Sequence, residues 1–378
     1  MPRFSVVVPT RDRPDLLAFC LQSLAEQTFS DLEVIVADNA VTAPAREVFD
    51  RWARDGWRYL RPERSLAMHD NFELACAEAA GDLVAVLIDK TVLHPSALQL
   101  TDQALAGQPE VDIVTWWNDG YNPLDEEHHP GKGRFIPGAD PVEVTRYDPR
   151  VELARRFEHA EPRGRDPVHY VRGKIVFGAY SRRLLDRIRA QAGRLFHPLA
   201  PDYTSMVPAC VLAEAAVDLG RPLLVSYNSV RSNGRRQAAD ARHARRFVES
   251  VDAAILDELP ISGVYASHHN VVSYDLVSSA ARCPPGSTPP LNMPNLLRRV
   301  REDLEAVAWA DSQERRAQYA LLEAAEREHG GEPQRSPRAG RLCALKHVVA
   351  SVRRPPRAYG SPVEAARVAD RHYSPAAS

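Results

Sequence analysis

Lysine is scarce in this chain. The only lysines are Lys90, Lys132, Lys174 and Lys346, so arginine supplies 44 of the 48 basic residues. Basic and acidic residues nearly balance, at 48 against 50, and the net charge of −2 gives no indication of nucleic acid as a partner. A predicted strand that ends on one of the four lysines therefore stands out.

Closely spaced cysteine pairs and long apolar runs are absent from the sequence, and each absence argues against a class of protein. The chain has no C-x-x-C pair, so neither a zinc site nor a disulfide framework is indicated. No apolar run approaches the roughly 20 residues of a membrane span, and the N-terminus has no signal-peptide pattern. We expect a soluble, cytoplasmic protein with no transmembrane segment and with reduced thiols at its five cysteines, Cys20, Cys76, Cys210, Cys283 and Cys343.

Glycine is absent where many nucleotide-binding folds use it. The stretch PTRDRPD (9–15) follows the first predicted strand and contains no glycine. This argues against a G-x-G-x-x-G dinucleotide site and against a nucleotidyltransferase, which needs a glycine-rich loop there. A P-loop is missing as well. Any phosphate must therefore be bound by side chains, a metal ion or helix N-termini.

The first 120 residues alternate apolar, β-branched runs with helical patterns. Such alternation is typical of parallel βαβ units whose sheet is covered on both faces. The sequence thus predicts an α/β fold with a mostly parallel sheet flanked by helices. Residues 119–170 are expected to be loops with a helix near 150–158, before strand and helix patterns return over 173–229. The early strands are predicted at 4–9, 32–39, 57–62, 83–88 and 111–118.

The chain becomes mainly helical from residue 241. The helical pattern at 296–330 can pack on the first domain or support a homodimer. The last 48 residues hold nine Lys or Arg against three Asp or Glu, with scattered Pro and Gly. We expect this basic tail to be partly ordered at best and dispensable for catalysis, the alternative being contact with a partner or an acidic surface.

Four short motifs follow one another in the N-terminal part. They are V-V-P-T-x-x-R-P at 7–14, a helix ending in Q-T at 27–28, V-x-D-N at 36–39 and N-x-x-x-A-x-x-x-A-x-G at 71–81. In this order, over roughly residues 3–120, they strongly resemble the opening of the family 2 glycosyltransferases, which have the GT-A fold. A weaker resemblance continues through PDYTSM (201–206) to SNG (232–234).

The resemblance implies an enzyme that moves a sugar from a UDP-, dTDP- or GDP-sugar to an acceptor by an inverting single displacement. The acceptor is an unknown small molecule or glycan. The implied GT-A catalytic domain covers 1–240, with the nucleotide sugar on about 1–120 and the acceptor on about 121–240. A helical region at 241–330 and the tail at 331–378 follow. The alternative is a glycosyltransferase-like protein that binds the nucleotide sugar without turnover.

Donor binding is placed by the resemblance at the ends of the first strands. A carboxylate there can accept a hydrogen bond from a base or a ribose hydroxyl, and arginine can pair with phosphate. Solvated arginines, a plain turn after the second strand or a helix cap near residue 70 are the alternatives. The implied donor-binding residues are Pro9, Thr10, Arg11, Arg13, Asp38, Asn39 and Asn71.

The predicted strand at 83–88 stops on Asp89, Lys90 and Thr91. The family usually has an acidic D-x-D-type motif here that holds a divalent cation on the donor diphosphate. In this chain Asp89 is the only acidic residue of the Asp89-Lys90-Thr91 stretch, so two interpretations remain. Asp89 holds Mg²⁺ or Mn²⁺, helped by Thr91, phosphate and water, or Lys90 is itself the cation that faces the diphosphate. An ion-paired turn is the bland alternative.

The acceptor side contains fewer signals. The resemblance implies that Asp202, at a loop-to-helix junction, is the general base, with a plain N-cap as the alternative. Trp116, Trp117 and Asn118 end a strand that should face the cleft, although strand alternation must direct one tryptophan into the core. Residues 125–129 are interpreted as a solvated acidic and histidine-containing loop, and residues 232–236 either close over the diphosphate or form a surface turn.

Overall fold

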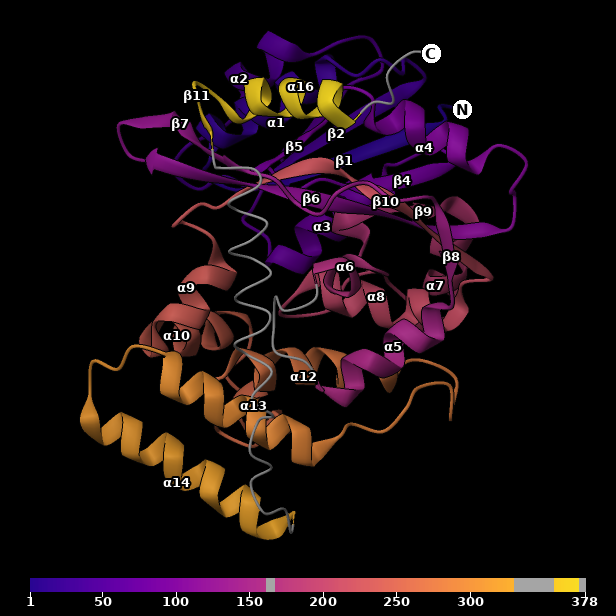
Figure 1. Cartoon of the computed structure of the whole chain (residues 1–378). Helices are drawn as coiled ribbons and strands as arrows, with labels where there is room; N and C mark the ends of the chain where they lie inside the picture. The colour runs from indigo at the N-terminus through magenta and orange to yellow at the C-terminus, as the bar shows by residue number, and fades with distance from the viewer. Residues whose placement is uncertain (161–166, 330–356, 374–378) are drawn as a thin grey trace.

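The computed structural model describes residues 1–160, 167–329 and 357–373. A single mixed sheet runs through the upper part of the molecule (Figure 1) and joins the eleven strands of the described residues. The strands are β1 (Phe4–Thr10), β2 (Leu32–Asp38), β3 (Arg58–Leu60), β4 (Leu83–Val86), β5 (Thr91–Leu93), β6 (Val111–Asp125), β7 (His129–Ile136), β8 (Thr145–Tyr147), β9 (Gly178–Ser181), β10 (Ala215–Tyr227) and β11 (Arg357–Tyr359).

The N-terminal half of the sheet is parallel. The strand order is β11-β7-β6-β9-β4-β1-β2-β3, and β1 lies between β2 and β4 with both neighbours parallel to it. Every residue of β1 is buried, because continuous apolar runs suit a sheet that is covered on both faces. The predicted α/β fold with a mostly parallel sheet is confirmed.

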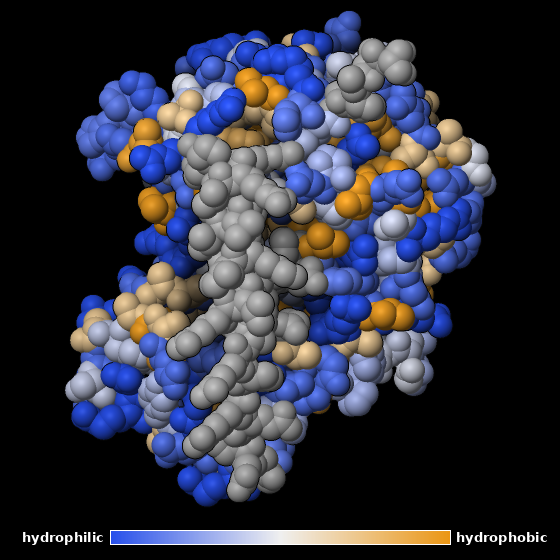
Figure 2. Space-filling model, viewed as in Figure 1, coloured by the Kyte–Doolittle hydropathy of each residue, from blue (hydrophilic) through white to orange (hydrophobic). Residues whose placement is uncertain are grey.

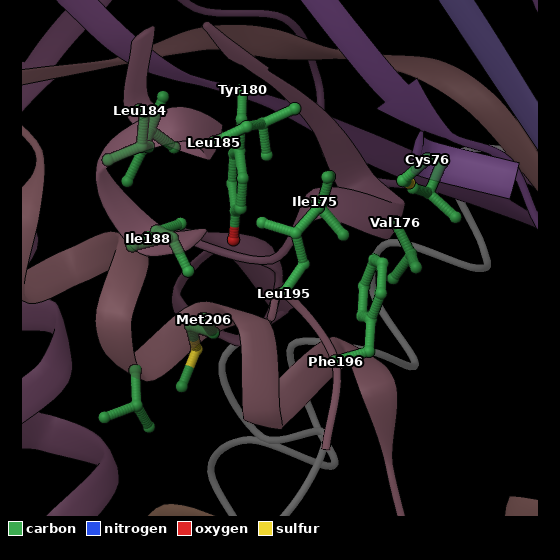
Figure 3. Close-up of a cluster of buried hydrophobic side chains, with 14 of the residues drawn as sticks. Cys76, Ile175, Val176, Tyr180, Leu184, Leu185, Ile188, Leu195, Phe196 and Met206 are labelled. Carbon is green, nitrogen blue, oxygen red and sulfur yellow. The ribbon is translucent and has the colours of Figure 1, made fainter. Parts of the chain in front are cut away.

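Helices cover both faces of this sheet. On one face α1 (Pro14–Ala25), α2 (Arg46–Trp52) and α4 (Ala97–Leu105) pack through a cluster that includes Leu17, Leu21 and Leu98. The other face carries α3 (Met68–Ala77), α5 (Pro149–Glu158), α7 (Arg182–Ala192) and α8 (Pro201–Leu212). Figure 3 shows the second cluster, in which Tyr180, Ile188 and Met206 lie together with residues from several elements.

The prediction of loops over 119–148 was wrong. Strand β6 continues to Asp125 and turns back as β7, and β8 pairs with β10. The hairpin is closely packed, since a Cβ at Gly133 would lie 2.3 Å from the ring of Tyr121. Turn-rich composition concealed these strands, because their stability comes from pairing partners that are distant in sequence. The helix expected near 150–158 is confirmed as α5.

The C-terminal region forms a helical layer with its own apolar core below the sheet (Figure 1). The long helical pattern at 296–330 is divided in two, and Asp311 caps the second helix through the backbone N–H of Gln313. No helix of the described residues has the length and apolarity needed to cross a membrane. The helices are α9 (Asn233–Ala239), α10 (Ala241–Val251), α11 (Ile255–Glu258), α12 (His268–Ala280), α13 (Met293–Ala306) and α14 (Ser312–Glu328).

Part of the predicted tail belongs to the sheet layer, while residues 330–356 lie outside the described part. Strand β11 pairs with β7, and α16 (Pro362–Tyr373) lies on the same face as α1 (yellow in Figure 1). Val363 is buried against β10, and the hydroxyl of Tyr373 donates to Asp119 Oδ1 at 2.9 Å. These contacts make β11 and α16 part of the folded sheet layer.

The visible surface gives no sign of a large apolar interface. On the face shown in Figure 2, hydrophobic residues are scattered in small groups among hydrophilic ones. Scattered exposed apolar side chains are normal for a soluble protein surface and need no partner to cover them.

Candidate active site

The carboxyl edge of the parallel strands brings three predicted residues together. Thr10 ends β1 beside Asp38 at the end of β2, in direct register. The Thr10 hydroxyl donates to Asp89 Oδ2 at 2.8 Å, although 79 residues separate the two in the chain. The expected shared edge therefore exists, but all three side chains are buried, with exposed fractions of 3% or less.

The carboxylate of Asp38 is already occupied by neighbouring donors. Its oxygens accept hydrogen bonds from the backbone N–H groups of Ala40 and Ala45 at 3.0 and 2.8 Å. The Tyr59 hydroxyl also donates to it, and Arg61 Nη1 lies 3.3 Å away. Burial and the bond to Asp38 raise the pKa of Tyr59 to about 12. Asp38 thus anchors the loop after β2 and holds Arg61 at the sheet edge.

The two predicted asparagines have a similar supporting role. Asn39 accepts from the backbone N–H of Leu66 and donates to its carbonyl, both at 2.9 Å. Asn71 lies inside α3, not at its N-cap, and its amide donates to the carbonyl of Ala37 at 3.0 Å. They connect the segment before α3 to the end of β2.

The first turn leaves one arginine exposed to solvent. Pro9 is buried in β1, whereas the side chain of Arg11 is 52% exposed. Asp12 has a left-handed φ of 53° and accepts hydrogen bonds from the backbone N–H groups of residues 41, 42 and 43. Burial raises the pKa of Asp12, but these N–H donors outweigh it and hold the pKa below its ordinary value. The turn is therefore fixed against the loop after β2.

Asp89 faces Arg13 and does not offer a free carboxylate. Arg13 Nε donates to Oδ2 at 3.0 Å, and Arg13 Nη2 lies 2.9 Å from Oδ1, which accepts no hydrogen bond from the described residues. The Asp89 side chain is 0% exposed, and burial raises its pKa despite Arg13, Thr10 and Lys90.

The donor set around Asp89 does not fit a divalent cation. Mg²⁺ and Mn²⁺ require several oxygen ligands, whereas both Asp89 oxygens already face Arg13. Among the described residues, no three His, Cys, Asp or Glu side chains are grouped so that they can hold a metal ion. We therefore derive no step through a metal.

Lys90 points toward the loop after β10. Its ammonium donates to Ser232 Oγ at 3.1 Å, so the predicted turn at 232–236, which is the start of α9, lies beside the end of β4. Burial lowers the pKa of Lys90, and the nearby charges of Arg13 and Arg235 lower it further. Two cations, Arg13 and Lys90, therefore act on the Asp89 carboxylate.

Asp202 lies in the first turn of α8, with its side chain 24% exposed. Its Oδ2 is 3.3 Å from Nζ of Lys174, a side chain that is 0% exposed. The backbone N–H of Ala200 donates to the buried Asp275 of α12 at 3.0 Å, which fixes the start of the helix.

Lys174 is enclosed by two tyrosine rings. Its ammonium lies 3.8 Å from the ring centroid of Tyr170 and 3.7 Å from that of Tyr203, which are close cation–π distances. Burial lowers the pKa of Lys174, but Tyr170, Tyr203 and Asp202 outweigh it, and the net shift is upward. Gly173, at φ +80°, directs the chain into the turn that carries the lysine.

Tyr170 lies in the short helix α6 (Pro167–Val171), and its ring faces the Lys174 ammonium at 3.8 Å.

The predicted acceptor residues are mostly interior. Trp116 is 1% exposed and its indole N–H donates to Thr101 at 2.9 Å, so we do not retain it as an acceptor residue. Trp117 is 8% exposed. Asn118 is half-buried, and its side-chain amide donates a hydrogen bond to the backbone carbonyl of Asp119. The loop at 125–129 forms local contacts and an ion pair with Arg231 instead of a metal site.

Sequence reasoning missed five residues around the site. Tyr59 and Arg61 could have been found, because they lie at the carboxyl end of the third parallel strand, which must lie beside the end of β2. The scarcity of lysine is a signal that applies to Lys174 as much as to Lys90. No sequence signal pointed to the enclosing rings of Tyr170 and Tyr203.

Comparison with known proteins finds similarity to one family over part of the chain. Residues 5–171 match the family model described as Glycosyl transferase family 2. The O-antigen biosynthesis protein RfbC of Myxococcus xanthus is 31% identical over 146 residues, which are 37% of this chain and 11% of that protein. The GalNAc(5)-diNAcBac-PP-undecaprenol beta-1,3-glucosyltransferase of Campylobacter jejuni is 32% identical over 101 residues, 26% of this chain and 33% of that one. The chain thus spans about a tenth and a third of these relatives.

Solved structures with a similar arrangement have low sequence identity. The S. aureus TarS 1–349 structure has a TM-score of 0.48 at 13% identity, covering 87% of this chain and 92% of that one. The mannosyltransferase PcManGT from Pyrobaculum calidifontis, in complex with GDP-Man and Mn²⁺, has a TM-score of 0.42 at 17% identity. This alignment covers 93% of the present chain and 86% of PcManGT.

Proposed function

Since residues 5–171 form a family 2 glycosyltransferase domain with the GT-A type of α/β sheet, we propose that this protein transfers a sugar from a nucleotide-diphosphate sugar to an acceptor hydroxyl with inversion. The observation that carries this proposal is the presence of two charged clusters, one with Arg13 and Lys90 beside Asp89 and one with Lys174 and Asp202. One is cationic and suits a diphosphate, and the other holds a carboxylate that suits a base.

The donor side is assigned to the edge formed by β1, β2 and β4. Exposed or half-exposed groups there are Arg11, Arg13, Arg61 and Lys90, whereas Asp38, Asn39 and Asn71 hold the backbone that carries them. Guanidinium and ammonium groups are suited to phosphate oxygens. A UDP-, dTDP- or GDP-sugar is the donor class.

The transfer step places Asp202 on the acceptor side. The acceptor oxygen forms a bond to the anomeric carbon while the bond from that carbon to the diphosphate oxygen breaks. The electron pair of the broken bond leaves with the nucleoside diphosphate, and the acceptor proton goes to Asp202. One direct displacement inverts the anomeric configuration. Lys174 orients the carboxylate, since the buried ammonium has little freedom to move.

We assign the catalytic unit to residues 1–240 and a supporting role to the helices of 241–330. The first unit contains both clusters of the candidate site. The helices have a separate apolar core, which includes Leu296 and Val300, and they contact the start of α8 through Asp275. The acceptor class remains a small molecule or a glycan, of which the two relatives' names favour the glycan.

One observation favours a second candidate, a nucleotide-sugar-binding protein without turnover. The proposed base is already ion-paired with Lys174, and a carboxylate that stays so engaged does not accept a proton readily. Release of nucleoside diphosphate from UDP-, dTDP- and GDP-sugars, with and without acceptor mixtures, separates the two functions.

The decisive comparison uses Asp202→Asn with Asp186→Asn as the matched control, since Asp186 is an exposed aspartate on α7. The proposal requires donor turnover by the wild type and the control, and its loss in Asp202→Asn with donor binding retained. Donor binding without turnover in all three proteins supports the second candidate and contradicts the first.

A further inference from the structure

The end of β4 has the charge pattern of an anion site. The only carboxylate of the Asp-Lys-Thr stretch, Asp89, has 0% side-chain exposure and is paired with Arg13 at 2.9 Å. The cation-binding capacity of this carboxylate is therefore already used by a protein cation. A divalent ion would have to displace this arginine from a buried carboxylate.

The cations themselves are partly exposed at the sheet edge. Arg13 keeps 21% of its side chain exposed, and Lys90 is half-buried with a single hydrogen bond, to Ser232. Arg235, in the first turns of α9, is exposed and lies close enough to Lys90 to lower its pKa. Like charges repel when no anion lies between them. Their approach is stabilised when an anionic group binds there.

Nearby acids do not neutralise this group. Arg231, the next cation along the loop after β10, is matched by Asp15 and Glu126 at 2.6 and 2.8 Å. Lys90 lies nearest to Asp89, which Arg13 already balances. The end of β4 is therefore left with a surplus of positive charge beside the proposed donor site.

We propose that Arg13 and Lys90, held in place by Asp89 and Ser232, bind the diphosphate of the sugar donor in place of a divalent cation. This inference rests on the proposed function and assigns a role within it. Asp89 is then a positioning residue that directs Arg13, and Lys90 supplies the compact positive charge at the departing phosphate. The start of α9, through Ser232, forms the far side of the diphosphate site.

The test measures binding of UDP, dTDP and GDP to the full chain by calorimetry, in excess EDTA and with Mn²⁺. We expect at least one of the three to bind in EDTA, with a dissociation constant that Mn²⁺ changes by less than about threefold. Lys90→Met weakens that binding about tenfold to a hundredfold, as for loss of one charge-assisted hydrogen bond. Lys90→Arg retains most of it, and the exposed Lys132→Met binds as the wild type does.

A second readout uses the metal alone. Electron paramagnetic resonance of Mn²⁺ titrated with protein should show only the free ion. Protein-bound Mn²⁺ that disappears in Asp89→Asn overturns the inference. Nucleotide binding that is lost in EDTA and restored by Mn²⁺ also overturns the inference. Binding by Lys90→Met that equals the wild type overturns it as well. In each of these cases the proposed donor class stands. If none of the three nucleotides binds under either condition, the proposed function falls together with this inference.

Discussion

Removal of the Arg13 side chain should destabilise the fold as well as the site. In Arg13→Met the Asp89 carboxylate stays buried, with only the Thr10 hydroxyl and the neighbouring Lys90 to stabilise its charge. Breaking a buried ion pair from one side typically costs about 3–5 kcal/mol of unfolding free energy. Because Arg13 is partly exposed, we expect a value near the lower limit, about 3 kcal/mol.

The double variant Arg13→Met/Asp89→Asn provides the critical comparison. An asparagine at position 89 has no charge, and its carbonyl oxygen can still accept from Thr10. The double variant should therefore recover to within about 1 kcal/mol of the wild type, so the two substitutions should be strongly non-additive. Arg46→Met is the matched control, because Arg46 pairs with Asp50 on an exposed helix surface, and it should leave the unfolding midpoint unchanged.

The effect should depend on pH in a defined direction. Burial already raises the pKa of Asp89, and loss of Arg13 raises it further. The folded state then binds this proton more tightly than the unfolded chain, so stability falls as the pH rises from the unfolded pKa toward the folded one. The deficit of Arg13→Met should therefore be smaller at about pH 5 than at about pH 8.

Urea unfolding followed by tryptophan fluorescence measures all four proteins at both pH values. The reasoning is refuted if Arg13→Met loses no more stability than Arg46→Met. It is equally refuted if the double variant is as unstable as Arg13→Met, because the deficit would then not come from an unpaired Asp89 charge.

Three other perturbations test the remaining structure. Asp202→Asn should lower kcat by roughly 10²-fold or more in a transfer assay while calorimetry shows unchanged nucleotide binding. Lys174→Met should lower kcat roughly tenfold to a hundredfold without changing nucleotide binding. Lys174→Arg should have a similarly low kcat, because a guanidinium does not fit between the two tyrosine rings. Deletion of residues 357–378 should lower the unfolding free energy by about 3 kcal/mol or more, because buried Val363 and Tyr373 each contribute about 1.5 kcal/mol or more. Thermal unfolding and dye binding to the exposed apolar surface measure this loss, and an unchanged melting temperature would show that α16 is not part of the folded unit.

The core of the sheet could be predicted because its signals are local. The strands β1 and β2 are continuous runs of buried apolar residues, each followed by a helical pattern, and such runs predict parallel strands. Once the strands are parallel, their carboxyl ends must lie at one edge. The resemblance named Thr10 and Asp89, this rule put them at the same edge, and the structure joins them by a hydrogen bond.

The parts that could not be predicted depend on partners far away in the chain. Strand β11 pairs with β7 across more than 200 residues, and neither strand has an apolar run of its own. The same limit applied to side-chain roles. Asp38 was correctly placed at the edge, but its occupation by Tyr59 and two backbone N–H groups depends on how the following loops fold. A motif gives the position of a carboxylate, whereas its neighbours decide whether it is free.

The two lysines of the site, Lys90 and Lys174, meet different physical requirements. The scarcity of lysine in the sequence therefore could not by itself explain both. Lys174 is completely enclosed, and a compact ammonium fits between two ring faces at 3.7 and 3.8 Å where a planar guanidinium does not. Lys90 follows the end of β4 and is only half-buried. In a chain with 44 arginines and four lysines, the enclosed position requires lysine by its shape, whereas the half-buried position requires only a positive charge. The replacement of either lysine by arginine therefore separates a requirement for shape from a requirement for charge.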